Sequence, residues 1–149
     1  MKKRTDEGEA LTGLILETFR LNGAMLEAGN RITRPHGLTS ARWQVMGAID
    51  LAGQALTVAQ IARRMGLARQ GVQRIVNDLV KLGMLGFETN IDHKRAPLIS
   101  ISEAGHKTLT EVGNAQVTWA NKLARGLGER RLKQALKVLE EVRQRSEQG

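Results

Sequence analysis

The segment 69–77 places arginine and amide side chains along one face of a predicted helix. These side chains are Arg69, Gln70, Gln73, Arg74 and Asn77. Arginine forms paired hydrogen bonds with guanine O6 and N7, and glutamine or asparagine pairs in the same way with adenine N6 and N7. Helix faces exposed only to solvent are commonly rich in glutamate, whereas this face has no acid before Asp78. We therefore interpret it as a surface that reads base edges in a DNA major groove.

The other face of this segment is apolar and must pack on something. Its side chains follow the helical period and are expected to face inward. They are Val72, Ile75, Val76, Leu79 and Leu82. A short helix is predicted just before, because Thr57 and Gln60 have the spacing of a capping box, and Leu56 and Ile61 that of a hydrophobic staple. With Gly66 in the turn, the pair forms a helix-turn-helix, and we add Thr57 to the predicted DNA contacts.

A β-hairpin is predicted directly after the second of these helices. The stretches 84–89 and 98–101 are typical of two short strands, and a polar loop, 90–97, lies between them. Lys94 and Arg95 in this loop are expected to reach phosphates or to enter a narrow minor groove, where the negative potential is enhanced. Asp92 is expected to hold Arg95 or an arginine of the recognition helix in position, because it would be repelled by DNA.

Four further helices are predicted around this centre. An apolar period begins at Leu11 and stops before Pro35, and a second helix follows Thr39 or Ser40. A long helix starts after Ser102, and a last one follows the glycines at 126 and 128. The predicted fold is mainly α, with about six helices and a small β-hairpin wing.

Composition restricts the classes of function. The chain has 149 residues, as expected for one domain, a net charge of +8 and no cysteine. Residues 57–107 contain eight Lys or Arg and four Asp or Glu, and residues 122–149 contain the same numbers of each. Such an excess favours polyanionic partners. No apolar run is long enough for a bilayer and no export signal is evident, so we expect a cytoplasmic protein without membrane contact.

Neither catalysis nor metal binding is indicated. The sequence has no nucleophile paired with a base, no nucleotide-binding glycine pattern and no cluster of carboxylates with histidines. His36, His93 and His106 have no metal-ligand spacing. We expect no enzyme, no cofactor and no metal site.

Three stretches resemble the MarR family of winged helix-turn-helix transcriptional regulators. Residues 37–45 resemble the opening of that family's second helix, and residues 56–80 resemble its helix-turn-helix. Residues 90–99, followed by Ser102-Glu103-Ala104-Gly105, resemble its wing. The resemblance implies one domain over 1–149, with a DNA-binding lobe at 39–102 and dimerisation helices at 9–33 and 103–147. It also implies a homodimer with intertwined helices that binds a near-palindromic operator in double-stranded DNA, with recognition helices about 34 Å apart.

The resemblance further implies a repressor relieved by a small ligand, often an aromatic compound, bound between the dimer interface and the DNA lobe. The candidate lining residues are Phe19, Met25, Trp43 and Trp119, although such side chains at helical spacing are more often plain core. The alternative is a winged-helix module that binds a protein, or DNA without sequence preference, and needs no ligand. The operator, the regulated genes and the direction of regulation stay open.

The chain departs from the family pattern at two positions. Gly71 stands where the family often has a serine that contacts DNA, and a glycine inside a helix costs about 1 kcal/mol relative to alanine. Ile91 stands where proline is frequent in the wing. We expect an unusual site preference from the first departure and a more mobile wing from the second.

Overall fold

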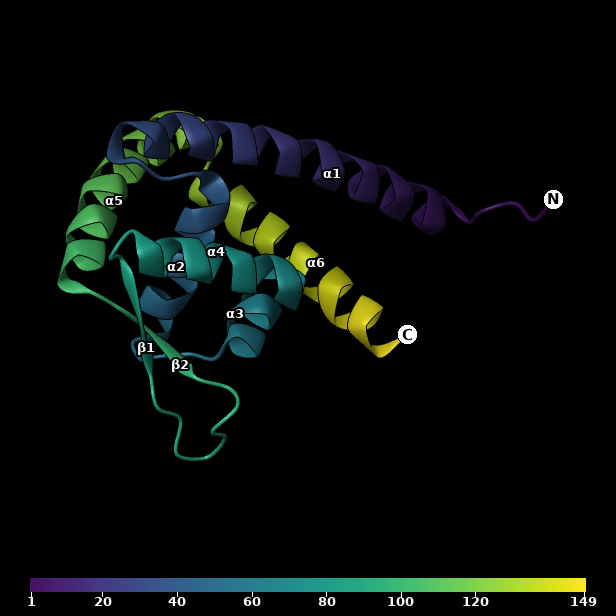
Figure 1. Cartoon of the computed structure of the whole chain (residues 1–149). Helices are drawn as coiled ribbons and strands as arrows, with labels where there is room; N and C mark the ends of the chain where they lie inside the picture. The colour runs from purple at the N-terminus through teal and green to yellow at the C-terminus, as the bar shows by residue number, and fades with distance from the viewer. The chain divides into compact units, whose positions relative to one another are not determined.

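The computed structural model describes residues 1–149 as six α-helices, one short 3-10 helix and a two-stranded antiparallel hairpin (Figure 1). In chain order the elements are α1 (Asp6–Thr33), η1 (Arg34–His36), α2 (Ser40–Ala52), α3 (Val58–Met65), α4 (Arg69–Lys81), β1 (Leu85–Glu88), β2 (Leu98–Ile101), α5 (Glu103–Ala124) and α6 (Glu129–Gln148). The prediction of a mainly helical fold with a small hairpin is confirmed. The chain forms two compact units, Met1–Gly113 and Asn114–Gly149.

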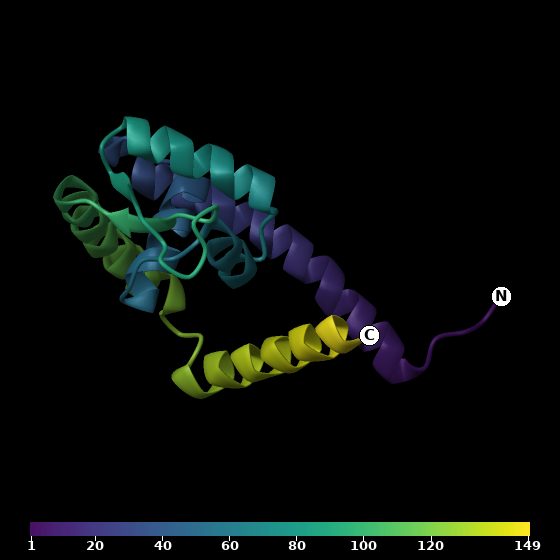
Figure 2. The same cartoon turned by 60° about the horizontal axis from the view of Figure 1, so that its bottom comes forward.

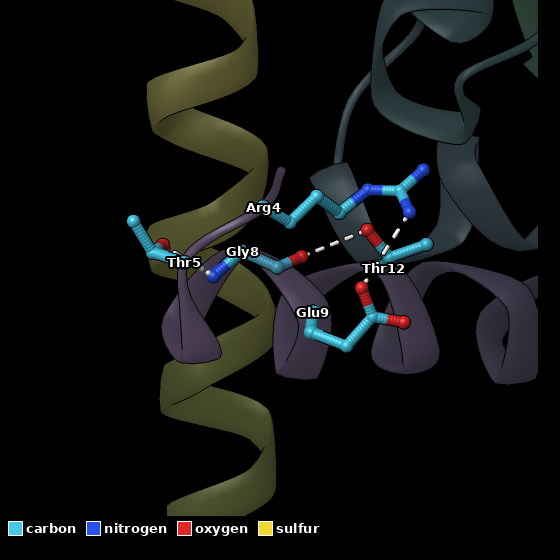
Figure 3. Close-up of polar contacts among 5 residues, drawn as sticks. All are labelled: Arg4, Thr5, Gly8, Glu9 and Thr12. Atoms are coloured by element: carbon cyan, nitrogen blue, oxygen red, sulfur yellow. Dashed lines mark hydrogen bonds and ion pairs between the residues drawn. The ribbon is translucent and has the colours of Figure 1, made fainter. Parts of the chain in front are cut away.

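The long first helix starts earlier than the apolar period predicts, because its first turn is capped by polar residues. The Gly8 amide donates to Thr5 Oγ1 at 3.1 Å, and Arg4 forms an ion pair with Glu9 at 3.5 Å (Figure 3). Asp6, Glu7 and Glu9 place negative charge at the positive end of the helix dipole.

A close crossing of α1 and α2 sets the first corner of the fold. A Cβ on Gly29 would lie 2.0 Å from Ser40 Oγ, so glycine permits this approach with the Ser40 side chain in its present position. Asn30 Oδ1 accepts a hydrogen bond from the Ser40 amide at 2.8 Å, which ties the two helices together. Between them, Pro35 opens η1 and Gly37 ends it in the left-handed conformation with φ of 73°.

The core lies between α2, α3, α4, the hairpin and the first half of α5. Its completely buried side chains are Val45, Met46, Ile61, Val72, Val76, Leu79, Ile99 and Val112. Thr39 caps α2 and Thr57 caps α3, the latter in a full capping box with Gln60. The predicted staple residues Leu56 and Ile61 are both buried in this core.

The hairpin pairs Leu85 with Ile101 and Glu88 with Leu98 in an antiparallel register. A third segment joins it, because Leu56 and Ile99 exchange two backbone hydrogen bonds of 3.1 and 2.7 Å. The start of α3 is therefore anchored to the returning strand. The loop after β1 extends away from α2, α3 and α4 (Figure 1), and it comes toward the viewer when the molecule is turned (Figure 2).

The start of α5 is also locked to the hairpin. Ser102 Oγ accepts from the Gly105 amide at 3.1 Å and donates to the Gly83 carbonyl. A Cβ on Gly105 would lie 2.2 Å from the Met84 carbonyl oxygen, so this turn requires glycine. None of the helices combines the length and the apolar composition that a bilayer-spanning segment needs.

Candidate nucleic-acid interface

The helix-turn-helix consists of α3 and α4. Ile61 and Ala62 of α3 are buried, and Gly66 ends the helix in the left-handed conformation with φ of 64°. The Leu67 amide then donates to the Ala62 carbonyl at 3.0 Å, which closes the turn before α4 begins. This geometry agrees with the predicted role of Gly66 in the turn.

The inward face of α4 holds the helix in the core. Val72, Val76 and Leu79 are completely buried, and Ile75 packs against them while partly exposed. The prediction for Leu82 is wrong, since this side chain is 53% exposed. Leu82 is the C-cap of α4, where the chain leaves the helical path, and so it no longer follows the period of the preceding turns.

The outward face of α4 carries all the predicted base-reading side chains. Arg69, Gln70, Gln73, Arg74 and Asn77 are all exposed. The Gln73 amide donates to Asn77 Oδ1 at 3.0 Å, so two of these side chains are already ordered relative to each other. The predicted division of α4 into an apolar face and a polar face is confirmed. The contact of the polar side with DNA stays a prediction.

The one acid within α4 is engaged by a neighbouring helix. Asp78 Oδ2 lies 3.8 Å from a guanidinium nitrogen of Arg42 on α2. This pair partly neutralises the carboxylate nearest to the polar face. It leaves Arg69 and Arg74 without an acidic partner within 4 Å.

No side chain caps the first turn of α4. Its N-cap is Ala68, which contributes no hydrogen bond, and Gly71 in the first turn leaves open space where a Cβ would be. The first amide groups of a helix have no partner within the helix and carry partial positive charge, so this end is open to an anionic oxygen.

The wing loop between β1 and β2 is organised by a residue that the sequence analysis did not single out. Asn90 is 8% exposed, and its side chain donates to the Ala96 carbonyl at 2.9 Å and accepts from the Asp92 amide at 3.2 Å. Asn90 thereby joins both sides of the loop. An asparagine at a strand end is a common turn former, and this was the available signal.

Lys94 and Arg95 extend from this loop as predicted. Both are exposed, and neither has an acidic partner within 4 Å. The prediction for Asp92 is wrong in this structure, because its carboxylate forms no ion pair and its backbone amide instead takes part in the turn at Asn90. Asp92 is adjacent to the turn, which directs its side chain to solvent.

The two basic regions of the chain differ in how their charges are compensated. Arg63, Arg64, Arg69, Arg74, Lys94 and Arg95 take part in no ion pair. In α6, by contrast, Lys133 pairs with Glu129 and Arg143 with Glu147. Arg130, Arg131, Lys137 and Arg145 of α6 are unpaired as well, so the helix-turn-helix and wing are distinguished by having none of their cations engaged by an acid.

The Thr57 hydroxyl, a predicted DNA contact, also has a structural role as the cap of α3. Its Oγ1 accepts a hydrogen bond from the Gln60 amide at 3.2 Å, and Gln60 Oε1 accepts from the Thr57 amide at 2.9 Å. The capping box uses Thr57 Oγ1 only as an acceptor, so the hydroxyl can still donate its proton to a phosphate oxygen.

Of the four candidate ligand-lining residues, the three in the first unit, Phe19, Met25 and Trp43, do not line a pocket of that unit. Phe19 and Met25 are exposed on α1, Trp43 packs against the core, and Trp119 belongs to the second unit. A pocket of about 360 Å³ lies instead between α1, α2 and the helix-turn-helix. Its lining includes Leu26, Gln44, Met65, Gly71 and Ile75.

The histidines form separate pairs with carboxylates. His36 Nδ1 lies 3.3 Å from Glu111 Oε2, and His106 Nδ1 lies 3.9 Å from Asp50 Oδ1. His93 belongs to the wing loop. No group of three or more His, Cys, Asp or Glu side chains is arranged to hold a metal ion.

This geometry defines a winged helix-turn-helix protein, and comparison with known proteins agrees with that class. The MarR family model matches residues 36–96, which span α2, the helix-turn-helix and most of the wing loop. The uncharacterized protein Rv2011c of Mycobacterium tuberculosis is 36% identical over 116 residues, which cover 78% of this chain and 80% of that protein. The chain belongs to the MarR family, whose members are transcriptional regulators and not enzymes.

Solved structures share the fold at low sequence identity. The M. tuberculosis transcriptional regulator MosR, in complex with DNA, is similar with a TM-score of 0.72 and 19% identity, over 89% of this chain and 96% of that one. CouR from Rhodococcus jostii RHA1, bound to p-coumaroyl-CoA, is similar with a TM-score of 0.76 and 20% identity, over 88% of this chain and 90% of that one. These likenesses concern the fold.

Proposed function

We propose that this protein is a sequence-specific, DNA-binding transcriptional regulator that acts as a homodimer. The observation that carries the proposal is the outward face of α4. It presents arginine and amide side chains with no acid before Asp78, opposite the buried Val72, Val76 and Leu79. These are the side chains that recognise guanine and adenine edges, and they are concentrated in the first half of the helix.

Electrostatics supports DNA as the partner. The cations of α3, α4 and the wing loop have no acid within 4 Å, so each is available to a phosphate. Contacts to phosphate release condensed counterions and make the affinity depend on salt. We expect Thr57, Lys94 and Arg95 to contact the backbone or minor groove, and the α4 residues to read bases.

The dimer is supported by apolar surface that the single chain leaves uncovered. On α1, Leu11, Ile15 and Phe19 are 41%, 39% and 68% exposed. No residue of α6 is buried, although Leu132, Leu136 and Leu139 repeat along one of its faces. Exposed apolar patches of this kind mark protein interfaces. We assign the dimer contacts to residues 9–33 and 103–147, around a lobe at 39–102.

We further propose that the protein is a repressor released by a small aromatic ligand. CouR, a protein of the same fold, was crystallised with p-coumaroyl-CoA. The pocket of about 360 Å³ adjoins Gly66 and Gly71, so an occupant would press on the turn and first part of α4. Phe19, Met25, Trp43 and Trp119 remain candidate contacts for a ligand held in the assembled dimer.

Selection of bound sequences from random double-stranded DNA tests the regulator proposal directly. We expect the purified protein to enrich a near-palindrome with half-sites one helical turn, about 34 Å, apart. Enrichment of no sequence, with equal affinity for all duplexes, would overturn this proposal. That result would favour the alternative of a winged-helix module that binds a protein or DNA without sequence preference.

A further inference from the structure

One large aliphatic side chain stands out in the wing loop. Ile91 is 90% exposed, whereas Ile99 and Leu85 on the hairpin strands are buried in the core. Isolated apolar residues are common on protein surfaces, but few large aliphatic side chains are this exposed. In this chain only Met1 at the free terminus is more exposed, and Leu51 at 84% comes next.

The exposure of Ile91 is imposed by the turn that carries it. Asn90, which precedes it, is buried and accepts a hydrogen bond from the Asp92 amide, which follows it. The same Asn90 side chain donates to the Ala96 carbonyl across the loop. Because the buried Asn90 side chain also holds the Asp92 backbone, the turn keeps the Ile91 side chain exposed to solvent.

The surroundings of Ile91 identify the kind of partner that would cover it. Lys94 and Arg95 lie in the same loop with no acidic partner, and this loop extends away from α2, α3 and α4 (Figure 1). An apolar protein surface or a core would not suit two unpaired cations a few residues away. The minor groove of DNA suits both, because its negative potential attracts the cations and an apolar side chain can insert between the stacked faces of two adjacent base pairs.

We propose that Ile91 is a wedge that enters the minor groove and partly unstacks one base step, so that the bound DNA is kinked at the wing. Apolar side chains inserted in this way bend a duplex toward the major groove. The proposal rests on the DNA-binding function proposed above and adds a contact that reads deformability rather than base edges. Flexible pyrimidine–purine steps are expected under the wing, since they unstack most easily.

The test compares Ile91→Asn with the unchanged protein on the sequence selected from random DNA. The bend is measured by energy transfer between dyes at the two ends of the duplex. Unstacking is measured by the fluorescence of 2-aminopurine placed at the step under the wing. We expect the variant to lose the bend and the fluorescence increase, and to bind this site about tenfold more weakly, as for the loss of one buried aliphatic side chain.

Two control variants separate the wedge from other effects. Leu51→Asn removes an aliphatic side chain of similar exposure on α2 and is expected to change neither affinity nor bend. Lys94→Ala is expected to weaken binding to every duplex while the kink is kept. A straight duplex in the wild-type complex, or an unchanged bend with Ile91→Asn, would overturn the wedge and leave the regulator proposal intact. Failure to select any sequence would overturn both.

Discussion

At the scale of single residues, the outward face of α4 makes base-specific and backbone contacts separable. Gln73 is exposed, and its amide is already oriented by Asn77. We expect Gln73→Ala to lower discrimination at one base-pair position by about 1–3 kcal/mol. Competition binding with operator duplexes altered one position at a time measures this loss. A uniform loss on operator and random duplexes alike would contradict a base-reading role for Gln73.

Lys94 is expected to behave in the opposite way. As a phosphate contact, its replacement by alanine should weaken binding about equally on all sequences and reduce the slope of log affinity against log salt by about 1. Titrations at several salt concentrations check this result. Lys133→Ala is the matched control, because this α6 lysine is already paired with Glu129 and should leave the slope unchanged. A steeper effect on the operator than on random DNA would contradict the assignment.

Gly71 offers a prediction about stability. A Cβ at this position would meet no heavy atom within 4 Å, so alanine is accommodated without strain. Because glycine inside a helix is less favourable than alanine by about 1 kcal/mol, we expect Gly71→Ala to raise the free energy of unfolding by about that amount in urea denaturation. Gly105→Ala is the contrast, since its Cβ would overlap the Met84 carbonyl oxygen and destabilise the fold. A destabilised Gly71→Ala protein would mean that α4 is strained at this point.

The two faces of α4 could be predicted at residue level because a long helix repeats its period without interruption. Leu82 was assigned wrongly because the period no longer applies at a C-cap. Asn90 was missed because its importance depends on Ala96, which lies across a loop and has no fixed spacing in sequence. The same holds for Gly29, whose need for glycine comes from the approach of Ser40 on another helix.

At the scale of elements, the wing depends on the Asn90 side chain. Asn90→Ala removes a donor to the Ala96 carbonyl and an acceptor for the Asp92 amide, so both backbone groups lose the partner that joins the two sides of the loop. We expect faster amide hydrogen exchange in residues 90–97 with little change in the helices. Affinity for DNA should fall because the loop that carries Lys94 and Arg95 loses its fixed shape.

Asn90→Asp provides the matched control for this element. The carboxylate keeps the acceptor for the Asp92 amide and loses only the donor to the Ala96 carbonyl. Exchange in the wing should therefore be intermediate between wild type and Asn90→Ala. Equal exchange rates in all three proteins would contradict the view that this side chain orders the loop.

Most elements were predictable because their ends carry local signals. The capping box at Thr57 and Gln60 fixes the start of α3, and the glycines at 53 and 66 end α2 and α3. The 3-10 turn η1 was not predicted, since Pro35 marks only where α1 must stop. Strand β1 is shorter than the apolar run 84–89, because pairing with β2 sets its length and that register is not local.

At the scale of the whole molecule, charge and apolar surface are assigned to different parts of the chain. The cations of α3, α4 and the wing loop have no acidic partner, and α1 and α6 each carry a row of uncovered apolar side chains. Two functions follow from this division, one that binds a polyanion and one that joins two chains. Neither depends on the other locally, but a two-fold dimer would place two recognition helices on one face of DNA.

The dimer proposal therefore predicts a coupled loss of assembly and DNA binding. Leu136 is 56% exposed and lies on the stripe that Leu132 and Leu139 form along α6. We expect Leu136→Asp to convert a dimer, with about twice the chain mass of 16.4 kDa, into a monomer. Light scattering after gel filtration measures the mass, and the monomer should bind a full operator no more tightly than a half-site.

Val138 supplies the control on the same helix. It is 48% exposed but points away from the stripe of Leu132, Leu136 and Leu139, because it follows Leu136 by two residues, about 200° around the helix. Val138→Asp introduces the same charge on the same helix but outside the stripe, so it should leave the dimer and its DNA affinity intact. A dimer that survives Leu136→Asp with unchanged operator binding would contradict assembly through this face of α6.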